Sequence, residues 1–410
     1  MSDQRSYTFF SYAFFAAMLG MAGLPIYIHA PKFFVDSYGI SLSALGVALF
    51  ALRLLDFIQD PLLGRLAERT LNLRSLPIWV AAVVMGLGMF GLFSMEAPFS
   101  PVLWFSLSLA AVFSGFSFLM IRFYANGVMR FGSEGQLHLA RWRESGNLLG
   151  VCLAAIMPTL LIDITQTPFA IFAYLFCGIV FLAVLLMQRE WHFTGAPAPS
   201  SKKQNTLSDP ILRQMLVLAV LNTAPVAVSS TLFLFFVESR LMAPDMAGPL
   251  LIVFFLAAAI SAPMWTFLAD RFGAKRVLLF SMLAAIFVFL NAFFLSTGQT
   301  SRFAVICVAS GATLGADLAL LPAIFARHLA KTGARAEVAF GFWNFASKVS
   351  LALAAVTVLP LVEFFGFRSG VENTQSGLLA LSFGYAALPC LLKILAIWRL
   401  LGLRFEDARG

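Results

Sequence analysis

The stretch RLLDFIQDPLLGRLAERT, residues 53–70, carries three charged side chains among apolar neighbours. Asp56 and Asp60 are four residues apart, and Arg53 comes three residues before Asp56, so an α-helix places all three on one face. One guanidinium can neutralise only one of the two carboxylates. The charge of the other carboxylate favours the binding of a cation or a proton.

The composition of the whole chain is that of an integral membrane protein. Of 410 residues, 60% are hydrophobic and 12% are charged, and the mean hydropathy is +0.88. Soluble domains average about 25% charged residues, so this chain has too little polar surface for water. Twelve apolar stretches are close to the length of about 20 residues that a spanning helix needs. The predicted spans are 8–29, 40–62, 76–95, 102–127, 143–162, 168–187, 212–237, 248–269, 277–297, 303–326, 338–362 and 377–399.

The positive charges indicate how the chain is threaded. Most of the 28 Lys and Arg residues fall in loops on one side of the predicted spans. By the positive-inside rule that side is cytoplasmic, and both termini lie there. The formal net charge of +8 is therefore explained by topology, and no nucleic-acid partner is expected. The basic residues that fall within or at the edge of a span are Arg53, Arg122, Arg143, Lys348 and Lys393.

The chain repeats itself at the end of the second span of each half. PLLGRLAER at 61–69 aligns without gaps with PMWTFLADR at 263–271. A polar segment that contains Pro and Ser separates the two copies, so we predict a six-helix half at 1–188, a cytoplasmic linker at 189–211 and a second six-helix half at 212–410. Parallel six-helix halves are the organisation of major facilitator transporters. The fold prediction is therefore an all-α membrane protein with twelve transmembrane helices.

The repeat also shows that the fold does not require charged residues at the positions of Asp56 and Asp60. Asp56 and Asp60 align with Ala258 and Ala262 of the second half, and Arg53 aligns with Phe255, so the helix position itself does not demand charge. Even on insertion scales an ionised side chain near the middle of a membrane costs about 2.5–3.5 kcal/mol. The carboxylates therefore predict a cation or proton site, and a structural ion pair with Arg53 is the alternative reading.

The same stretch resembles the signature of a known transporter family. Its pattern, R-x-x-D-x-x-x-D-P-x-x-G, is that of the glycoside–pentoside–hexuronide:cation symporters, the melibiose permease-like family of the major facilitator superfamily. The resemblance implies that Asp56 and Asp60 bind Na⁺, Li⁺ or H⁺ and that Gln59 offers a further oxygen. It also implies a monomer. The carboxylates suit an alkali ion or a proton equally, and the choice between these two stays open.

The resemblance carries over to further charged residues one at a time. Arg143 stands where family members have an Arg in the substrate region, and the alternative is a membrane-edge anchor that reaches the headgroups. Lys348 lies inside the span 338–362, in a setting where the melibiose permease has a Lys implicated in coupling. Asp317 lies in the span 303–326, and a structural pairing with Lys348 is the alternative to a substrate or coupling role. The loops after the two repeats resemble the latch loops of the superfamily, and the gating residues predicted there are Arg65, Glu68, Arg69, Asp270, Arg271, Lys275 and Arg276.

Two positions depart from the family pattern. Where the melibiose permease binds its galactoside with aspartates of the first and fourth helices, this chain has Gly20 and Arg122. The acceptors for sugar hydroxyls are therefore missing, and an added cation would leave the central charges net positive. We predict an anionic or zwitterionic solute on this ground, with Tyr124 and Asn126 as polar contacts near Arg122. Sugars, sugar acids, lysolipids and small anions all remain open.

The sequence therefore predicts a cation-coupled secondary transporter of a small organic solute. A proton-driven exporter would use the same carboxylates, and a sensor or assembly protein of the same fold is a further alternative. No H-E-x-x-H, C-x-x-C or phosphate-binding glycine loop occurs, so we expect neither an enzyme nor a cofactor.

Overall fold

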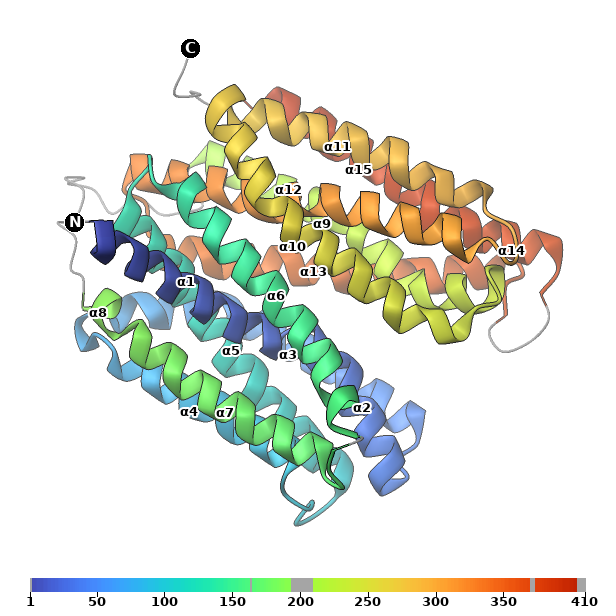
Figure 1. The fold of residues 1–410 in the computed structure, drawn as a ribbon, viewed down its shortest axis with the longest axis horizontal. Coiled ribbons are helices and arrows are strands. Elements are labelled where there is room, and N and C mark those ends of the chain that lie inside the picture. The colour runs from blue at the N-terminus through green and yellow to red at the C-terminus, as the bar shows by residue number, and fades with distance from the viewer. Residues whose placement is uncertain (1, 163, 193–208, 369–372, 404–410) are drawn as a thin grey trace. The chain divides into compact units, whose positions relative to one another are not determined.

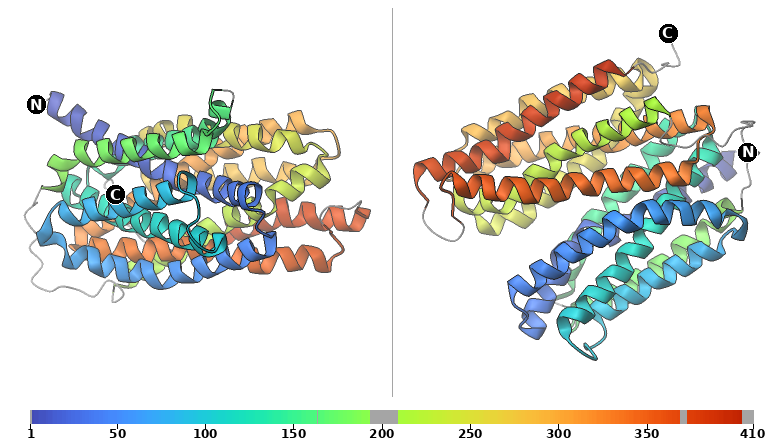
Figure 2. Two further views of the ribbon diagram at one scale, coloured as in Figure 1. Left: turned by 90° about the horizontal axis from the view of Figure 1, so that it is seen from below. Right: turned by 180° about the vertical axis from the view of Figure 1, so that it is seen from behind.

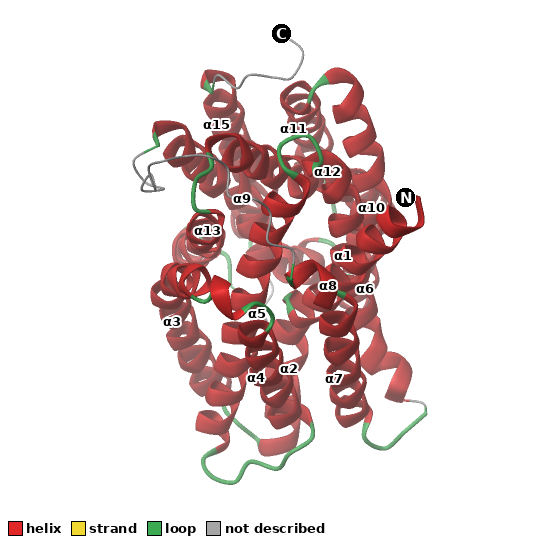
Figure 3. Ribbon diagram, turned by 90° about the vertical axis from the view of Figure 1, so that its left-hand side faces the viewer, coloured by secondary structure: helices red, strands yellow, loops and turns green. Residues whose placement is uncertain are grey.

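A computed structural model describes residues 2–162, 164–192, 209–368 and 373–403. Over these ranges every regular element is helical, and Figure 3 shows helices joined by short loops. Most of the predicted linker, 189–211, lies outside the described residues. The predicted division into halves therefore stays a prediction.

Contacts group the chain into two compact units. Unit 1 contains Met1–Thr206 together with Ala326–Phe345, and unit 2 contains Leu207–Phe325 together with Ala346–Gly410. In Figure 1 the blue-to-green helices belong to unit 1, and most of the yellow-to-red helices belong to unit 2.

Unit 1 is built on eight α-helices from the first part of the chain. They are α1 (Ser2–Ala22), α2 (Leu24–Tyr38), α3 (Leu42–Arg69), α4 (Leu76–Phe93), α5 (Pro101–Phe131), α6 (Gln136–Ile162), α7 (Pro168–Leu186) and α8 (Gln188–Trp191), with a 3₁₀ turn η1 (Leu71–Leu73) after α3. The helix α1 packs along α6, α4 packs on α5 and α7, and α5 also packs on α3. The last residues of α12 and the first residues of α13 complete this unit.

Unit 2 contains the remaining helices, with α12 only as far as Phe325 and α13 only from Ala346 onward. They are α9 (Pro210–Phe235), the π-helical η3 (Phe236–Arg240), the 3₁₀ turn η4 (Pro244–Met246), α10 (Ala247–Phe272), α11 (Ala274–Leu290), the 3₁₀ turn η5 (Asn291–Phe294), α12 (Thr300–Thr332), α13 (Ala336–Phe364), α14 (Gln375–Ser382), the π-helical η6 (Phe383–Ala387) and α15 (Leu388–Gly402). The helix α15 packs against α9 and α11. Figure 2 shows that α14, η6 and α15 follow one another as a single red helical stretch.

Nine helical segments of the described residues are long and apolar enough to cross a membrane. They coincide with nine of the twelve predicted spans. The other three predicted spans fall on α1–α2, α3 and α6, which are helical but are broken or carry more charge. The first of them breaks at Gly23, just before Pro25 in the first turn of α2, because proline cannot continue a helix from the preceding turn.

Both copies of the repeat end a helix, as the sequence predicts. The helix α3 ends at Arg69, and α10 ends one residue after Arg271. Pro61 and Pro263 lie inside these helices at matching positions. The two stretches therefore occupy the same place in their helices, although only the first carries the two aspartates.

Small residues allow α1 and α6 to approach closely, and Figure 1 shows the two helices side by side. A Cβ atom added at Gly146 would overlap the backbone oxygen of Ala13, and one added at Gly150 would overlap that of Ala17. Helices in membranes associate largely through such close packing. These two glycines therefore fix the separation of α1 and α6.

Replacing Gly150 by leucine should force α1 and α6 apart, because the obstacle is backbone and cannot move aside as a side chain does. We expect a loss of about 3 kcal/mol or more in the free energy of unfolding. Gly178 on α7 is the matched control, since a Cβ there meets nothing within 4 Å. Thermal unfolding of the two leucine variants in detergent checks this, and equal unfolding midpoints would contradict it.

Candidate functional site

The aspartates of the opening stretch lie on the buried face of α3. Asp56 is 2% exposed and Asp60 is fully buried, whereas Ile58 on the opposite face is 66% exposed. The helical period that predicts a shared face for the two carboxylates is therefore confirmed. The side chain of Arg53 lies outside the described part of the chain, so its pairing with either aspartate stays a prediction.

A neighbouring helix holds the orientation of this pair. The Nε2 atom of Gln59 donates to Oδ1 of Asp56 at 2.7 Å, and its Oε1 atom accepts from the hydroxyl of Ser114 on α5 at 2.8 Å. Gln59 thus orients Asp56, in addition to any role as an oxygen ligand. Ser114 could not be predicted as part of the site, because nothing in its local sequence distinguishes it from the other serines of α5.

The glycine of the signature has a packing role one turn after Asp60. A Cβ added at Gly64 would come within 2.9 Å of the backbone oxygen of Glu337 and 3.3 Å of the Cα atom of Gly341, both at the start of α13. A Cβ added at Gly341 would in turn lie 2.9 Å from the backbone oxygen of Asp60. The segment that carries the aspartates is therefore in direct backbone contact with α13 inside unit 1.

Arg143 is buried in unit 1. It is 2% exposed, its Nε atom donates to Oε1 of Glu144 at 2.7 Å, and its guanidinium lies 4.0 Å from the ring centroid of Tyr124. The hydroxyl of Tyr124 donates to the same Glu144 at 3.1 Å. The Nη2 atom of Arg143 has no hydrogen-bond partner among the described residues. Such burial does not favour the anchor interpretation, and the two N–H groups of Nη2 remain without a partner among the described residues.

Arg122 has a carboxylate partner that the sequence analysis did not identify. Its Nη1 atom lies 3.8 Å from Glu337 and 3.3 Å from the backbone oxygen of Ala67, and both charged side chains are buried. Asn126, the predicted contact near Arg122, faces other partners. It accepts from the hydroxyl of Tyr12 and donates to the backbone oxygen of Glu190 at 3.0 Å. The structure thus gives Asn126 a packing role.

The predicted gating residues divide into two groups. Glu68 forms a bidentate ion pair with Arg335, with 3.3 Å for each N–O contact. Lys275 instead donates to the backbone oxygens of Leu401 and Leu403 at the end of α15, where a cation satisfies the last carbonyls of the helix. For the remaining gating candidates, the role stays a prediction: Arg65, Arg69, Asp270, Arg271 and Arg276.

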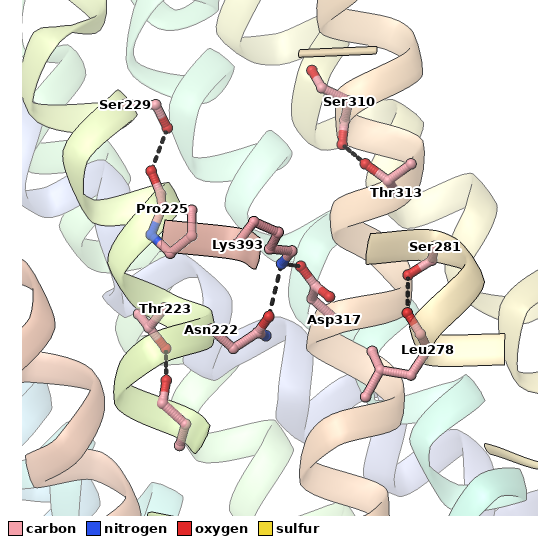
Figure 4. Close-up of polar contacts among 11 residues, drawn as sticks. Asn222, Thr223, Pro225, Ser229, Leu278, Ser281, Ser310, Thr313, Asp317 and Lys393 are labelled. Atoms are coloured by element: carbon pink, nitrogen blue, oxygen red, sulfur yellow. Dashed lines mark hydrogen bonds and ion pairs between the residues drawn. The ribbon is translucent and has the colours of Figure 1, made fainter. Parts of the chain in front are cut away.

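Asp317 pairs with a different lysine from the one expected. The Nζ atom of Lys393 on α15 donates to Oδ2 of Asp317 on α12 and, at 2.7 Å, to Oδ1 of Asn222 on α9 (Figure 4). The alternative that paired Asp317 with Lys348 is therefore not the one found, and Lys348 lies partly buried on α13. Lys393 could have been proposed as the partner of Asp317, because it is an ionisable residue inside an apolar span. Lys348 has the same property, so the sequence could not tell which of the two lysines pairs with Asp317.

A cavity adjoins this ion pair inside unit 2. It measures about 70 Å³ over the positions that the centre of a water molecule can take. Its walls come from α9, α10, α11, α12 and α15. The residues that line it are Pro225, Val226, Ser229, Phe254, Ala285, Ile286, Phe289, Ser310, Thr313, Leu314, Asp317, Pro389, Cys390 and Lys393.

Solved structures share this fold at low sequence identity. A bacterial homologue of the iron transporter ferroportin, in its outward-facing state, has a TM-score of 0.68 and 14% identity, covering 95% of this chain and 99% of that one. The fucose:proton symporter of E. coli has a TM-score of 0.67 and 12% identity, covering 95% and 98%. At such identities the likeness concerns the fold alone, and it confirms the predicted all-helical transporter architecture. The comparison with curated proteins gives no match.

One sequence family extends over nearly the whole chain. The family described as MFS/sugar transport protein matches residues 9–405. It is the melibiose permease-like family that the signature predicts, and its members are transporters and not enzymes. The chain therefore belongs to the MFS/sugar transport protein family and is a multi-pass membrane transporter.

Proposed function

We propose that this protein is a cation-coupled secondary transporter that moves a small organic solute across the cytoplasmic membrane by alternating access. Na⁺ or H⁺ binds at Asp56 and Asp60, and both termini lie in the cytoplasm. The observation that carries the proposal is the burial of two carboxylates on one face of α3, four residues apart, in a chain of this family. Buried ionisable groups in membrane helices usually mark ion and solute pathways.

Packing alone does not account for the two aspartates. The matching positions of the repeat, Ala258 and Ala262, are equally buried and apolar. Carboxylate oxygens are hard ligands that suit alkali ions, and a carboxylate also takes up a proton. We therefore propose that the monovalent cation, Na⁺ or H⁺, binds at these two carboxylates.

Arg143 is the residue of unit 1 that we propose for solute binding. Its guanidinium is held by Glu144 and stacked on Tyr124, which leaves Nη2 pre-positioned for an acceptor group. The sequence alone suggests that the charge of Arg122 attracts an anionic solute. In the structure Glu337 lies close enough to neutralise that charge, so Arg122 gives less support to an anionic solute. The family description and the fucose:proton symporter of the same fold favour a sugar or sugar derivative as the solute.

Alternating access also needs contacts that form and break. Glu68, which pairs with Arg335, lies in the last turn of the helix that carries the aspartates. It is one of the residues predicted for gating. We therefore propose that this pair latches one conformation and opens when cation and solute have both bound.

The proposal is tested by uptake into proteoliposomes. Labelled sugars and sugar acids are offered under an imposed Na⁺ gradient, an imposed proton gradient, or neither. We expect accumulation of one solute class that requires one of the two gradients. Accumulation that proceeds equally well without both gradients would contradict cation coupling.

Removing the hydroxyl that holds Gln59 should weaken cation binding without abolishing it. In Ser114→Ala the amide of Gln59 loses a hydrogen bond of 2.8 Å and no longer fixes Asp56. A hydrogen bond of this kind contributes about 1 kcal/mol, so we expect the concentration of Na⁺ or H⁺ for half-maximal uptake to rise about fivefold. Ser106→Ala is the control, since that hydroxyl donates only to the backbone of its own helix. Equal cation dependence of the two variants would contradict a positioning role.

A further inference from the structure

The cavity of unit 2 lies next to charges that the proposed cation site does not use. Asp317, Lys393 and Asn222 are 7%, 4% and 6% exposed, so all three are more than nine-tenths buried. Protein interiors rarely leave space larger than one water molecule. A water needs about 10–15 Å³ by the same measure, so 70 Å³ holds roughly five waters. A pair that only clamped three helices together would need no such space beside it.

The three side chains leave hydrogen-bonding capacity unused. An ammonium group has three N–H donors, and the described residues accept two of them, at Asn222 and Asp317. The Oδ1 atom of Asp317 has no hydrogen-bond partner among the described residues. In Figure 4 this second oxygen points away from Lys393. One N–H of Lys393 therefore remains for a ligand, beside a carboxylate whose second oxygen has almost no accessible surface.

The charges at this place restrict the ligand. Lys393 already serves as the cation of Asp317, and Asp317 as the anion of Lys393, so the pair is neutral. A bound metal ion would meet the ammonium, and a bound anion would meet the carboxylate. Either would leave an uncompensated charge in a buried site, which is strongly unfavourable. An uncharged group suits a neutral pair, and a hydroxyl group can accept from the remaining N–H of Lys393 and donate to the carboxylate of Asp317.

The rest of the wall is mostly apolar. Phe254, Phe289 and Leu314 contribute carbon surface to the cavity. The hydroxyls of Ser310 and Thr313 donate to backbone oxygens of their own helix, Ser310 at 2.6 Å and Thr313 at 2.8 Å. They therefore offer the cavity little beyond an oxygen lone pair. The site combines one polar corner with an apolar surround.

We infer that this cavity binds a small uncharged molecule that presents a hydroxyl group to Asp317 and Lys393 and an apolar face to Phe254 and Phe289. The space takes a molecule of about five waters in size. Its role as a solute subsite rests on the proposed transport function. Binding itself does not depend on a cation at Asp56 and Asp60.

The test uses four probes of equal size that differ in one group: benzyl alcohol, toluene, benzoate and benzylammonium. The thermal unfolding midpoint of the detergent-purified protein is followed as each probe is titrated, since a ligand of the native state raises stability by mass action. A hydrogen bond to a charged group should make benzyl alcohol bind at least about tenfold more tightly than toluene. Benzoate and benzylammonium should give no rise.

Two variants assign the effect to the cavity. The double variant Asp317→Leu, Lys393→Met removes both charges together, and benzyl alcohol and toluene should then become equivalent. Leu314→Trp fills the cavity without touching the pair, and the response to both probes should vanish. The inference is overturned if benzyl alcohol and toluene behave alike in the unmodified protein, if a charged probe binds best, or if either variant keeps the preference for the alcohol. Asp60→Asn should keep the alcohol response, so failure of the cation site and failure of this cavity are separate results.

Discussion

Replacing Lys393 by methionine should destabilise the protein by about 3–5 kcal/mol, because it leaves Asp317 as a buried carboxylate without its cation. Adding Asp317→Leu to the same chain should restore most of this loss, since the exchange of a buried ion pair for apolar side chains is often neutral. The measurement is the free energy of unfolding, or the unfolding midpoint, of both variants in detergent. If the Lys393→Met variant were as stable as the original protein, Lys393 would not be needed to neutralise Asp317, and the proposed buried ion pair would be contradicted.

The control for this experiment is Arg302→Met on α12, the helix that carries Asp317. Arg302 is exposed, so its substitution should change stability by no more than about 0.5 kcal/mol. A double variant that remains as unstable as Lys393→Met would mean that the two side chains do not act as a pair. Asn222 would then be the remaining partner of Lys393 to examine.

Replacing Asp60 by asparagine should abolish gradient-driven uptake. The change keeps the volume of a fully buried side chain but removes the negative charge that we propose for cation binding. Loss of a buried charge contact of about 3–5 kcal/mol corresponds to a fall in cation affinity of more than a hundredfold. Initial rates of solute uptake into proteoliposomes under the coupling gradient measure this effect.

Asp245→Asn is the matched control for the loss of uptake. Asp245 lies exposed in the short turn η4 of unit 2, and its replacement should leave uptake unchanged. If the Asp60→Asn variant still accumulated solute at the original rate, the coupling cation would have to bind elsewhere. Uptake lost in both variants would point to a general effect of removing negative charge.

The sequence predicts those features that depend on local pattern. The spacing of Asp56 and Asp60 predicts one helical face, and the burial of both confirms it. The match to the repeat predicts that 61–69 and 263–271 end helices, and they do. The signature predicts the family, which extends over residues 9–405. Period, length and motif are properties of a short stretch, so a single sequence carries them.

Partners from distant stretches could not be predicted in the same way. Asp317 pairs with Lys393 and not with Lys348, although both lysines lie in predicted spans. Gln59 meets Ser114 of α5, and Arg122 meets Glu337 of α13. The helical period tells which face a side chain is on, but not which helix lies opposite that face. Which helix lies opposite is decided by long-range packing, and this packing cannot be predicted from the local pattern of a single sequence.

The central claim, a monovalent cation at Asp56 and Asp60, is tested most directly by cation-dependent stability. The unfolding midpoint of the detergent-purified protein is measured while Na⁺ or Li⁺ replaces choline at constant ionic strength, at several pH values, for the unmodified protein and for Asp60→Asn. We predict that the midpoint of the unmodified protein responds to an alkali ion or to pH, and that Asp60→Asn loses this response. An unmodified protein that responds to neither, or a variant that responds in the same way, would contradict the account.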